Sequence, residues 1–158
     1  MTPTQALVDE LNRERAQLLA LTAKLDEAHA RIIVYGNWRV QDILAHIASG
    51  EKGSLTYAKM ICANRPMPAT FEGQPFELDR WNEAQVEKRR GKPLAEIMSE
   101  LNENRRATLA FVAELDEENC KRRGSHPVFK DATVAEVISS IAEADRHHLQ
   151  EIAGAIAQ

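Results

Sequence analysis

Hydrophobic side chains recur every three or four residues along most of this chain of 158 residues, as they do in amphipathic helices. The pattern predicts a first long helix that starts near Thr4 and stops near Arg31, before a turn at the sequence YGNW. A second long helix is predicted from about Val40 to Ala63. The apolar face of the first helix consists of Leu7, Leu11, Leu18, Leu21 and Leu25.

The same spacing returns in the second half of the chain. Pro93 opens a third long helix, at a position where its missing N–H group costs nothing, and the apolar face continues to Leu115. The sequence TVAE then forms a capping box, in which Thr133 caps the last long helix and Glu136 reaches back to the cap. The apolar face of this last helix carries Val137, Ile141, Ala144, His148, Ile152 and Ala155.

The chain between the second and third long helices breaks the helical pattern. Three prolines and a glycine within Asn64–Phe76 predict a loop, and a short helix over Glu77–Arg90 follows, with Leu78 and Trp81 turned inward. No alternating apolar run indicates a strand. The sequence therefore predicts an all-α fold, a four-helix bundle in which this long crossover carries a short extra helix and neighbouring helices can run parallel. We expect residues 1–158 to form a single domain.

Composition narrows the classes of function. The formal net charge of −4 argues against nonspecific nucleic-acid binding. No apolar run is long enough to span a membrane, and the first residues are too charged for a signal peptide. Cys62 and Cys120 lie far apart, so neither a disulfide scaffold nor a thiolate zinc site is indicated. We expect a cytoplasmic protein without membrane or nucleic-acid partners.

Two histidines fall on the inward faces of predicted helices. His148 lies one turn after Ala144 on the last helix, whereas its neighbour His147 is rotated by about 100° away from that face. His46 lies on the second helix. Metal sites in bundles take their ligands from different helices, although a lone inward histidine is more often a hydrogen-bonded core residue than a ligand.

A stripe of small and polar residues runs along the second helix, where steps of four and three join His46, Gly50, Gly53 and Tyr57. Glycine inside a helix costs roughly 1 kcal/mol relative to alanine, so two glycines on one stripe need a structural reason. Close packing against another helix is one explanation, and an open pocket beside His46 is the other. In a pocket, both glycines would border a substrate.

Arg105 and Glu14 interrupt the apolar faces of their helices. We expect both to lie toward the end of the bundle, with their stems packed and their charges in water. If they are buried instead, they need partners. Arg105 would then pair with Glu14 or Asp145, or hold an anionic group of a substrate.

Two stretches of the sequence carry a resemblance to a known family. NWRVQDILAHIASGE resembles the second-helix signature of the DinB/YfiT-like superfamily, and ADRHHLQEI resembles its last-helix signature. The superfamily includes a small-molecule resistance branch of ClbS-like proteins. The resemblance implies a four-helix bundle, often a homodimer, with a divalent metal held by one histidine of the second helix and two of the last. Known members include thiol-dependent transferases and isomerases, and others lack the metal and inactivate or bind toxic small molecules.

Carried over to this sequence, the family's ligands fall on His46 and His148, but the remaining ligand position holds Ala144, which cannot coordinate a metal. Three interpretations stay open. Asp145 replaces the missing ligand, the two histidines bind a metal weakly, or the metal is lost and the pocket is kept. Because loss of one of three ligands weakens binding severely, we expect no tightly bound cofactor, with zinc or nickel as the metals if one binds.

Three functional hypotheses follow. The first is an enzyme that hydrolyses an electrophilic small molecule or transfers a low-molecular-weight thiol to it. A bound metal would lower the pKa of water or thiol; without it, His46 or His148 would act as general base while Tyr57 and Arg105 orient the substrate. The second is a metal-free protein that binds and sequesters such a compound. The third is an interaction protein whose bundle only dimerises, and the glycine stripe and inward histidines rank it last.

Overall fold

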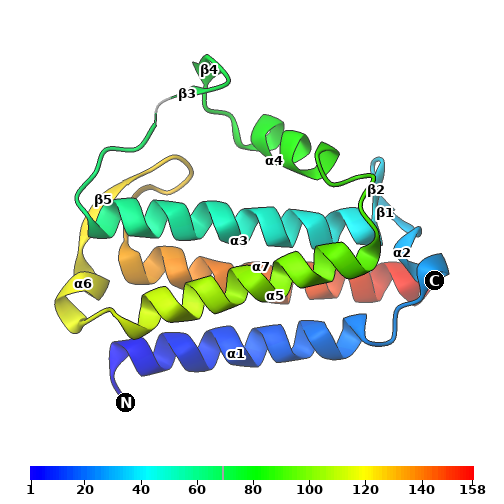
Figure 1. Cartoon of the computed structure of the whole chain (residues 1–158), viewed down its shortest axis with the longest axis horizontal. Helices are drawn as coiled ribbons and strands as arrows, with labels where there is room; N and C mark the ends of the chain where they lie inside the picture. The colour runs from blue at the N-terminus through cyan, green and yellow to red at the C-terminus, as the bar shows by residue number, and fades with distance from the viewer. Residues whose placement is uncertain (69) are drawn as a thin grey trace.

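Four long helices packed side by side form the body of the computed structural model, which describes residues 1–68 and 70–158 (Figure 1). The first packs against the last, the last against the second, and the second against the third. The predicted four-helix bundle is therefore confirmed. The four helices are α1 (Pro3–Thr22), α3 (Val40–Cys62), α5 (Leu94–Ala113) and α7 (Val134–Ile156).

The helices run in two parallel pairs. Figure 1 shows α1 and α7 pointing one way and their neighbours α3 and α5 pointing the other way. Parallel neighbours cannot be joined by a short loop, so the chain crosses over between α3 and α5 along the outside of the bundle. The crossover carries β3 (Thr70–Phe71), β4 (Gln74–Pro75) and α4 (Leu78–Glu87), which packs against α3. This confirms the predicted crossover with its short helix; Ala69, which belongs to the predicted loop, lies outside the described residues.

The first predicted helix is wrong at its C-terminal end. α1 ends at Thr22, and a separate short helix, α2 (Glu27–Ala30), follows. The carboxylate of Asp26 accepts a hydrogen bond from the backbone N–H of His29 at 2.8 Å, which caps α2. A side chain that satisfies a free N–H group in this way starts a new helix more readily than it continues an old one. Leu78 is also placed differently from the prediction, because it is 40% exposed.

The expectation of a fold without strands is wrong in detail. The described residues contain three two-stranded antiparallel hairpins. Their strands are two to four residues long, too short to show an alternating apolar pattern. The predicted YGNW turn is the tip of the first hairpin, where Gly36 adopts a φ of 55° that favours glycine. The remaining elements are β1 (Ile33–Tyr35), β2 (Trp38–Arg39), α6 (Glu117–Lys121), β5 (Arg123–His126) and β6 (Lys130–Thr133).

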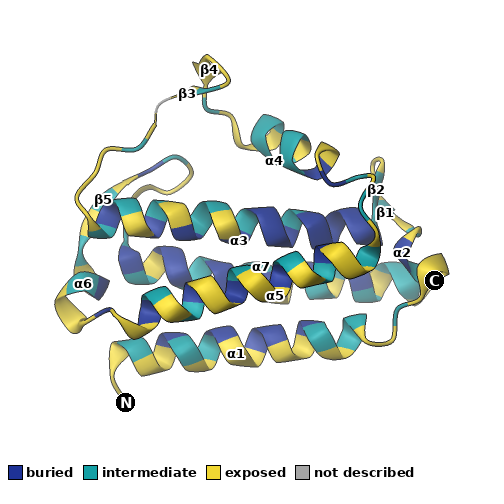
Figure 2. Cartoon of the chain, in the orientation of Figure 1, coloured by how far each residue is buried: buried dark blue, intermediate teal, exposed yellow. Residues whose placement is uncertain are grey.

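The buried face of each long helix points into the bundle (Figure 2). The apolar interior consists of two clusters, one containing Leu11 and Val112 and the other containing Leu18 and Leu101. Each of these helices therefore contributes to both clusters, and the residues between its two contributions lie in the layer that separates them. Among the described residues, no helix combines the length and the apolar character that crossing a membrane requires.

Candidate functional site

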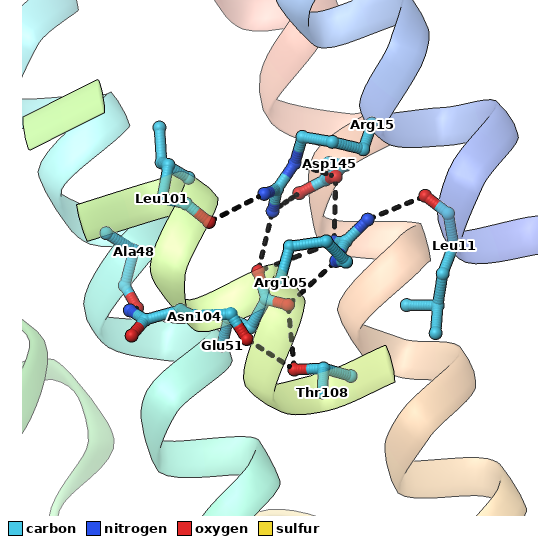
Figure 3. A network of polar contacts seen from close by, with 9 residues as sticks. All are labelled: Leu11, Arg15, Ala48, Glu51, Leu101, Asn104, Arg105, Thr108 and Asp145. Atoms are coloured by element: carbon cyan, nitrogen blue, oxygen red, sulfur yellow. Dashed lines mark hydrogen bonds and ion pairs between the residues drawn. The ribbon is translucent and has the colours of Figure 1, made fainter. Parts of the chain in front are cut away.

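A layer of four charged side chains separates the two apolar clusters (Figure 3). Arg15 of α1, Glu51 of α3, Arg105 of α5 and Asp145 of α7 are each at most 5% exposed. Arg15 donates to Asp145 Oδ2 at 2.8 Å through Nε and to Glu51 Oε2 at 2.6 Å through Nη2. Arg105 donates to Glu51 Oε1 at 2.8 Å and to Asp145 Oδ2 at 3.1 Å. Two cations and two anions thus neutralise each other inside the bundle.

The remaining polar atoms of this charged layer are also paired. Arg15 Nη1 donates to the backbone oxygen of Leu101 at 3.0 Å, and Thr108 Oγ1 donates to Glu51 Oε1 at 2.8 Å. Burial alone would lower the pKa of Arg15, but Asp145 and Glu51 raise it by more, so that its pKa lies above the ordinary value. Because each long helix supplies one charge, sliding any helix along its neighbours would break several charged hydrogen bonds.

This charged layer corrects the predictions made for Arg105, Glu14 and Asp145. Arg105 and Glu14 are 5% exposed rather than at a solvated end, and Glu14 lies 3.4 Å from Arg146. Of the alternatives left open for a buried Arg105, the pairing with Asp145 is the one found, so its guanidinium is not free to hold a substrate. Both carboxylate oxygens of Asp145 accept hydrogen bonds from the arginines, which argues against Asp145 as a replacement metal ligand.

A cavity of about 200 Å³ lies directly beside the charged layer. Its walls come from α3, α7, α4 and the hairpin β5–β6. The carboxylate-bearing residues Glu51 and Asp145 belong to both the charged layer and the cavity wall, while most of the remaining wall is apolar. A pocket of this kind, with a few convergent polar groups, suits a small and largely apolar molecule.

His46 and His148 face each other in the cavity wall, as their places on the helices predict. Their ring centroids are 4.8 Å apart and the rings meet edge to face at 82°. Within the described residues, His46 Nδ1 is buried and has no hydrogen-bond partner. Burial, and to a lesser extent the nearby His148 and His147, together lower the pKa of His46 to about 4, so His46 is neutral at physiological pH.

His148 is held in place by a neighbour that the sequence interpretation missed. Its Nδ1 contacts Glu151 Oε1, one turn further along α7. Burial lowers the pKa of His148, and the hydrogen bond to Glu151 opposes this without cancelling it. His147 has a side chain that is 70% exposed, which agrees with its predicted position off the inward face. The spacing of three between His148 and Glu151 was the available signal for this pair.

The two glycines of α3 have different neighbours, so each of the two explanations holds for one of them. A Cβ atom at Gly53 would lie 3.0 Å from Cη2 of Trp81, which shows that Gly53 lets the indole of α4 pack closely. A Cβ atom at Gly50 would meet nothing within 4 Å, so Gly50 leaves the cavity open. Tyr57 also lines the cavity, and burial raises the pKa of its hydroxyl.

The donor atoms in the cavity do not complete the three-histidine metal site. His46 and His148 supply two imidazoles, but the methyl group of Ala144 occupies the third position in the wall, and Asp145 is bound to arginines. A second set of donors, which shares His148 with the cavity, lies along α7, where ligand atoms of His147, His148 and Glu151 lie within 4.8 Å of one another. Tight metal binding needs three or four well-placed ligands, so the cavity itself does not fit a resident metal.

Most of the chain matches a known protein family. The family model described as the DinB superfamily matches residues 10–152. The chain belongs to this superfamily. A comparison with curated proteins found no significant match.

Several solved structures share the fold. YfiT from Bacillus subtilis, called a probable metal-dependent hydrolase with an unusual four-helix bundle topology, has a TM-score of 0.74 at 18% identity, covering 96% of this chain and 84% of its own. The colibactin self-resistance protein ClbS, solved in complex with double-stranded DNA, has a TM-score of 0.80 at 11% identity, covering 96% and 94%. An uncharacterised protein from Escherichia coli UTI89 has a TM-score of 0.80 at 9% identity, covering 96% and 91%. At these identities the likeness shows the fold alone.

Proposed function

We propose that this DinB-superfamily chain binds a small, neutral electrophile in the cavity and replaces its leaving group with water or a low-molecular-weight thiol, with His148 as general base. The observation that carries the proposal is the facing histidine pair, in which His46 Nδ1 is buried without a partner and His148 is oriented by Glu151. A buried polar atom without a protein partner is costly unless a ligand or water meets it.

The contact between His148 and Glu151 selects one tautomer of the imidazole. A carboxylate only accepts hydrogen bonds, so the proton of the neutral ring resides on Nδ1 and the lone pair on Nε2. The lowered pKa values of His46 and His148 support neutral rings at physiological pH, the state that a general base requires.

The proposed reaction moves one proton and exchanges one bond. Nε2 of His148 takes the proton of the water or thiol as its oxygen or sulfur attacks the electrophilic carbon. The leaving group departs with the electron pair of the broken bond and receives the proton from the imidazolium. His46 Nδ1 holds the nucleophile beside the substrate, and the neutral hydroxyl of Tyr57 donates a hydrogen bond to the substrate. Gly50 provides the space that the bound molecule occupies.

A second candidate function is metal-free sequestration without turnover. The largely apolar cavity wall and the exposed Leu78 and Val128 at its lining favour binding of an apolar compound. ClbS is a self-resistance protein, and by analogy this chain would protect by binding a toxic compound. Sequestration needs the cavity but neither the base nor its orientation by Glu151.

Turnover of model electrophiles separates these functions. Hydrolysis of nitrophenyl butyrate and conjugation of glutathione to chlorodinitrobenzene would be measured with and without EDTA. His148→Gln should lower the rate roughly 100-fold or more, since a positioned general base contributes a factor of this size. Glu151→Ala should lower it less, and His29→Gln on α2, outside the cavity, should change nothing. Activity that survives EDTA and depends on His148 supports the proposal.

Two outcomes would overturn the proposed enzyme. Binding without turnover would establish sequestration instead. Activity lost in EDTA and restored by zinc would assign the chemistry to a metal, despite the incomplete set of donors in the cavity.

A further inference from the structure

His126 is a third histidine in the cavity wall, and no motif of the sequence singles it out. It is the last residue of β5 and is 7% exposed. Its ring stacks on Phe129 with centroids 4.4 Å apart and an interplanar angle of 15°, and it meets the ring of Tyr57 edge to face at 5.2 Å. These contacts fix the position of the imidazole in the wall that also holds His46 and His148.

The hairpin tip determines which nitrogen of His126 carries the proton. The backbone N–H groups of Val128 and Phe129 both donate to Nδ1, at 3.1 and 3.0 Å. A nitrogen that accepts two hydrogen bonds cannot itself carry a proton, so the neutral ring has its N–H at Nε2. Protonating Nδ1 would set three N–H groups against one another. Burial also lowers the pKa of His126, which agrees with a neutral ring.

The Nε2–H group of His126 is left available to a ligand. Among the described residues, both hydrogen bonds of the His126 side chain are made by Nδ1, and no protein group bonds to Nε2. Nε2 is not one of the fully buried atoms, so a ligand can reach it. The hydroxyl of the adjacent Tyr57 likewise has no hydrogen-bond partner within the described part of the chain, and its raised pKa keeps it protonated. The cavity wall, which is largely apolar, therefore holds two neutral donors on rings that contact each other.

We propose that His126 is a specificity-determining residue, whose Nε2–H group, beside the hydroxyl of Tyr57, selects small molecules with a carbonyl-type oxygen over otherwise similar hydrocarbons. This inference rests on the proposed function, because it concerns the same cavity, and it names the class of ligand. An uncharged acceptor suits this site, since its donors are neutral and the nearby carboxylates of Glu51 and Asp145 are neutralised by arginines. An apolar or aromatic body attached to the carbonyl would fill the remaining space.

The tautomer can be tested without any ligand or turnover. Long-range ¹H–¹⁵N correlation spectra of protein labelled with ¹⁵N-histidine, recorded at pH 7, should show the Nε2–H form for His126. The assignment would come from the signals lost in His126→Asn. An Nδ1–H form or a doubly protonated ring would overturn the proposal, whatever the activity of the protein.

The selectivity can be tested with two probes of nearly equal shape, acetophenone and α-methylstyrene, which differ by a C=O in place of a C=CH₂ group. The intact protein should bind the ketone roughly tenfold more tightly, the value of one good hydrogen bond. In His126→Phe this preference should disappear while binding of the hydrocarbon is retained. His126→Asn is the second variant, because its side-chain oxygen can still accept from the hairpin amides if the phenylalanine variant does not fold.

The binding outcomes separate this proposal from the enzymatic one. If the parent protein and both variants prefer the ketone over the hydrocarbon to the same extent, the role of His126 is overturned. A preference that vanishes in the variants supports it, even where the protein shows no turnover, in which case only the catalytic role of His148 fails. Chemical shift changes on ketone binding should be largest at the Nε2–H group of His126.

Discussion

The charged layer and the cavity lie side by side and share residues of α3 and α7, yet buried polar groups are satisfied in opposite ways in the two regions. In the layer, every charged group of Arg15, Glu51, Arg105 and Asp145 has protein partners. In the cavity, the described structure gives His46 Nδ1 no partner. Polar groups that hold a bundle together are paired within it, whereas polar groups that serve a ligand are left for the ligand.

Burial also has opposite electrostatic results in the two regions. The arginine of the layer keeps its charge, because carboxylates raise the pKa of Arg15 by more than burial lowers it. The imidazole of His46 loses its charge, because burial and the neighbouring histidines all lower its pKa. The histidine of the cavity is therefore neutral, whereas the arginine of the adjacent layer is charged.

The largest effect is expected from completing the set of metal ligands in the cavity, which should raise the affinity for metal. Ala144→His places an imidazole four residues before His148 on one helix face, with Cβ atoms about 5–6 Å apart. With His46 opposite, the affinity for nickel or zinc should rise by roughly four orders of magnitude, or about 5.5 kcal/mol, as measured by calorimetry.

Two further variants control this metal-binding experiment. His46→Ala in the Ala144→His background should abolish the gain, and Ser140→His, one turn earlier in the cavity wall, should not reproduce it. An unchanged affinity in Ala144→His would mean that the cavity has lost the geometry for a metal. Weak binding that disappears in His147→Ala would belong to the second set of donors, His147, His148 and Glu151.

Breaking the charged layer should give the next largest effect. Asp145→Ala leaves Arg15 and Arg105 facing Glu51 alone, so one buried charge is uncompensated. Removing one member of a buried ion pair costs about 3–5 kcal/mol, which urea denaturation would report as a lower midpoint. Asp131→Ala, which breaks the exposed pair with Arg123, is the matched control and should change stability little. Equal effects of both variants would contradict a structural role for the layer.

The neutral state of His46 predicts how stability depends on pH. Its pKa is about 4 in the folded chain against 6.5 ordinarily, so the unfolded chain takes up the proton first as the pH falls. This contribution is fully present above about pH 6.5 and is lost toward pH 4, amounting to about 3 kcal/mol. Burial lowers the pKa of His148 in the same direction. Between pH 4 and 7, the free energy of unfolding should depend less steeply on pH in His46→Gln than in the parent protein. An unchanged pH dependence would refute the buried neutral imidazole.

Substitution of the two glycines of α3 should give the smallest change in stability, and it compares two positions within the cavity wall. Gly50→Ala should stabilise the chain by about 1 kcal/mol, because alanine favours the helix and its methyl group enters open space. Gly53→Ala should gain nothing, since its Cβ would lie 3.0 Å from the indole of Trp81. Thermal or urea denaturation would distinguish them. A larger gain from Gly53→Ala would show that the indole moves freely.

Local signals in the sequence were enough for the helices and for part of the cavity. The capping box of Thr133 and the inward positions of His46 and His148 follow from spacing along one helix. Arg15 could not be identified in this way, because its partners Glu51 and Asp145 lie 36 and 130 residues away. The guanidinium of an arginine near the apolar face of a helix usually lies in water, and only the fold shows that Arg15 contacts two buried carboxylates.

The hairpin residues were hidden for a different reason. His126 lies in a strand of four residues, and its role depends on two backbone amides at the hairpin tip rather than on any spacing of side chains. The expected homodimer and the absence of nucleic-acid binding stay predictions, the second alongside a structural relative solved with double-stranded DNA.

The charged layer also constrains the order in which the protein folds. Its four members come from four helices, and Asp145 is supplied by α7, the last of them along the chain. A partly folded chain that has docked α1, α3 and α5 holds two arginines against the single carboxylate of Glu51. One positive charge then lies unpaired in its interior, a cost that disfavours a compact three-helix intermediate. The docking of α7 removes that charge imbalance, so the bundle should fold cooperatively. The same step brings α7 against α1, the helices farthest apart in the sequence, and completes the interior.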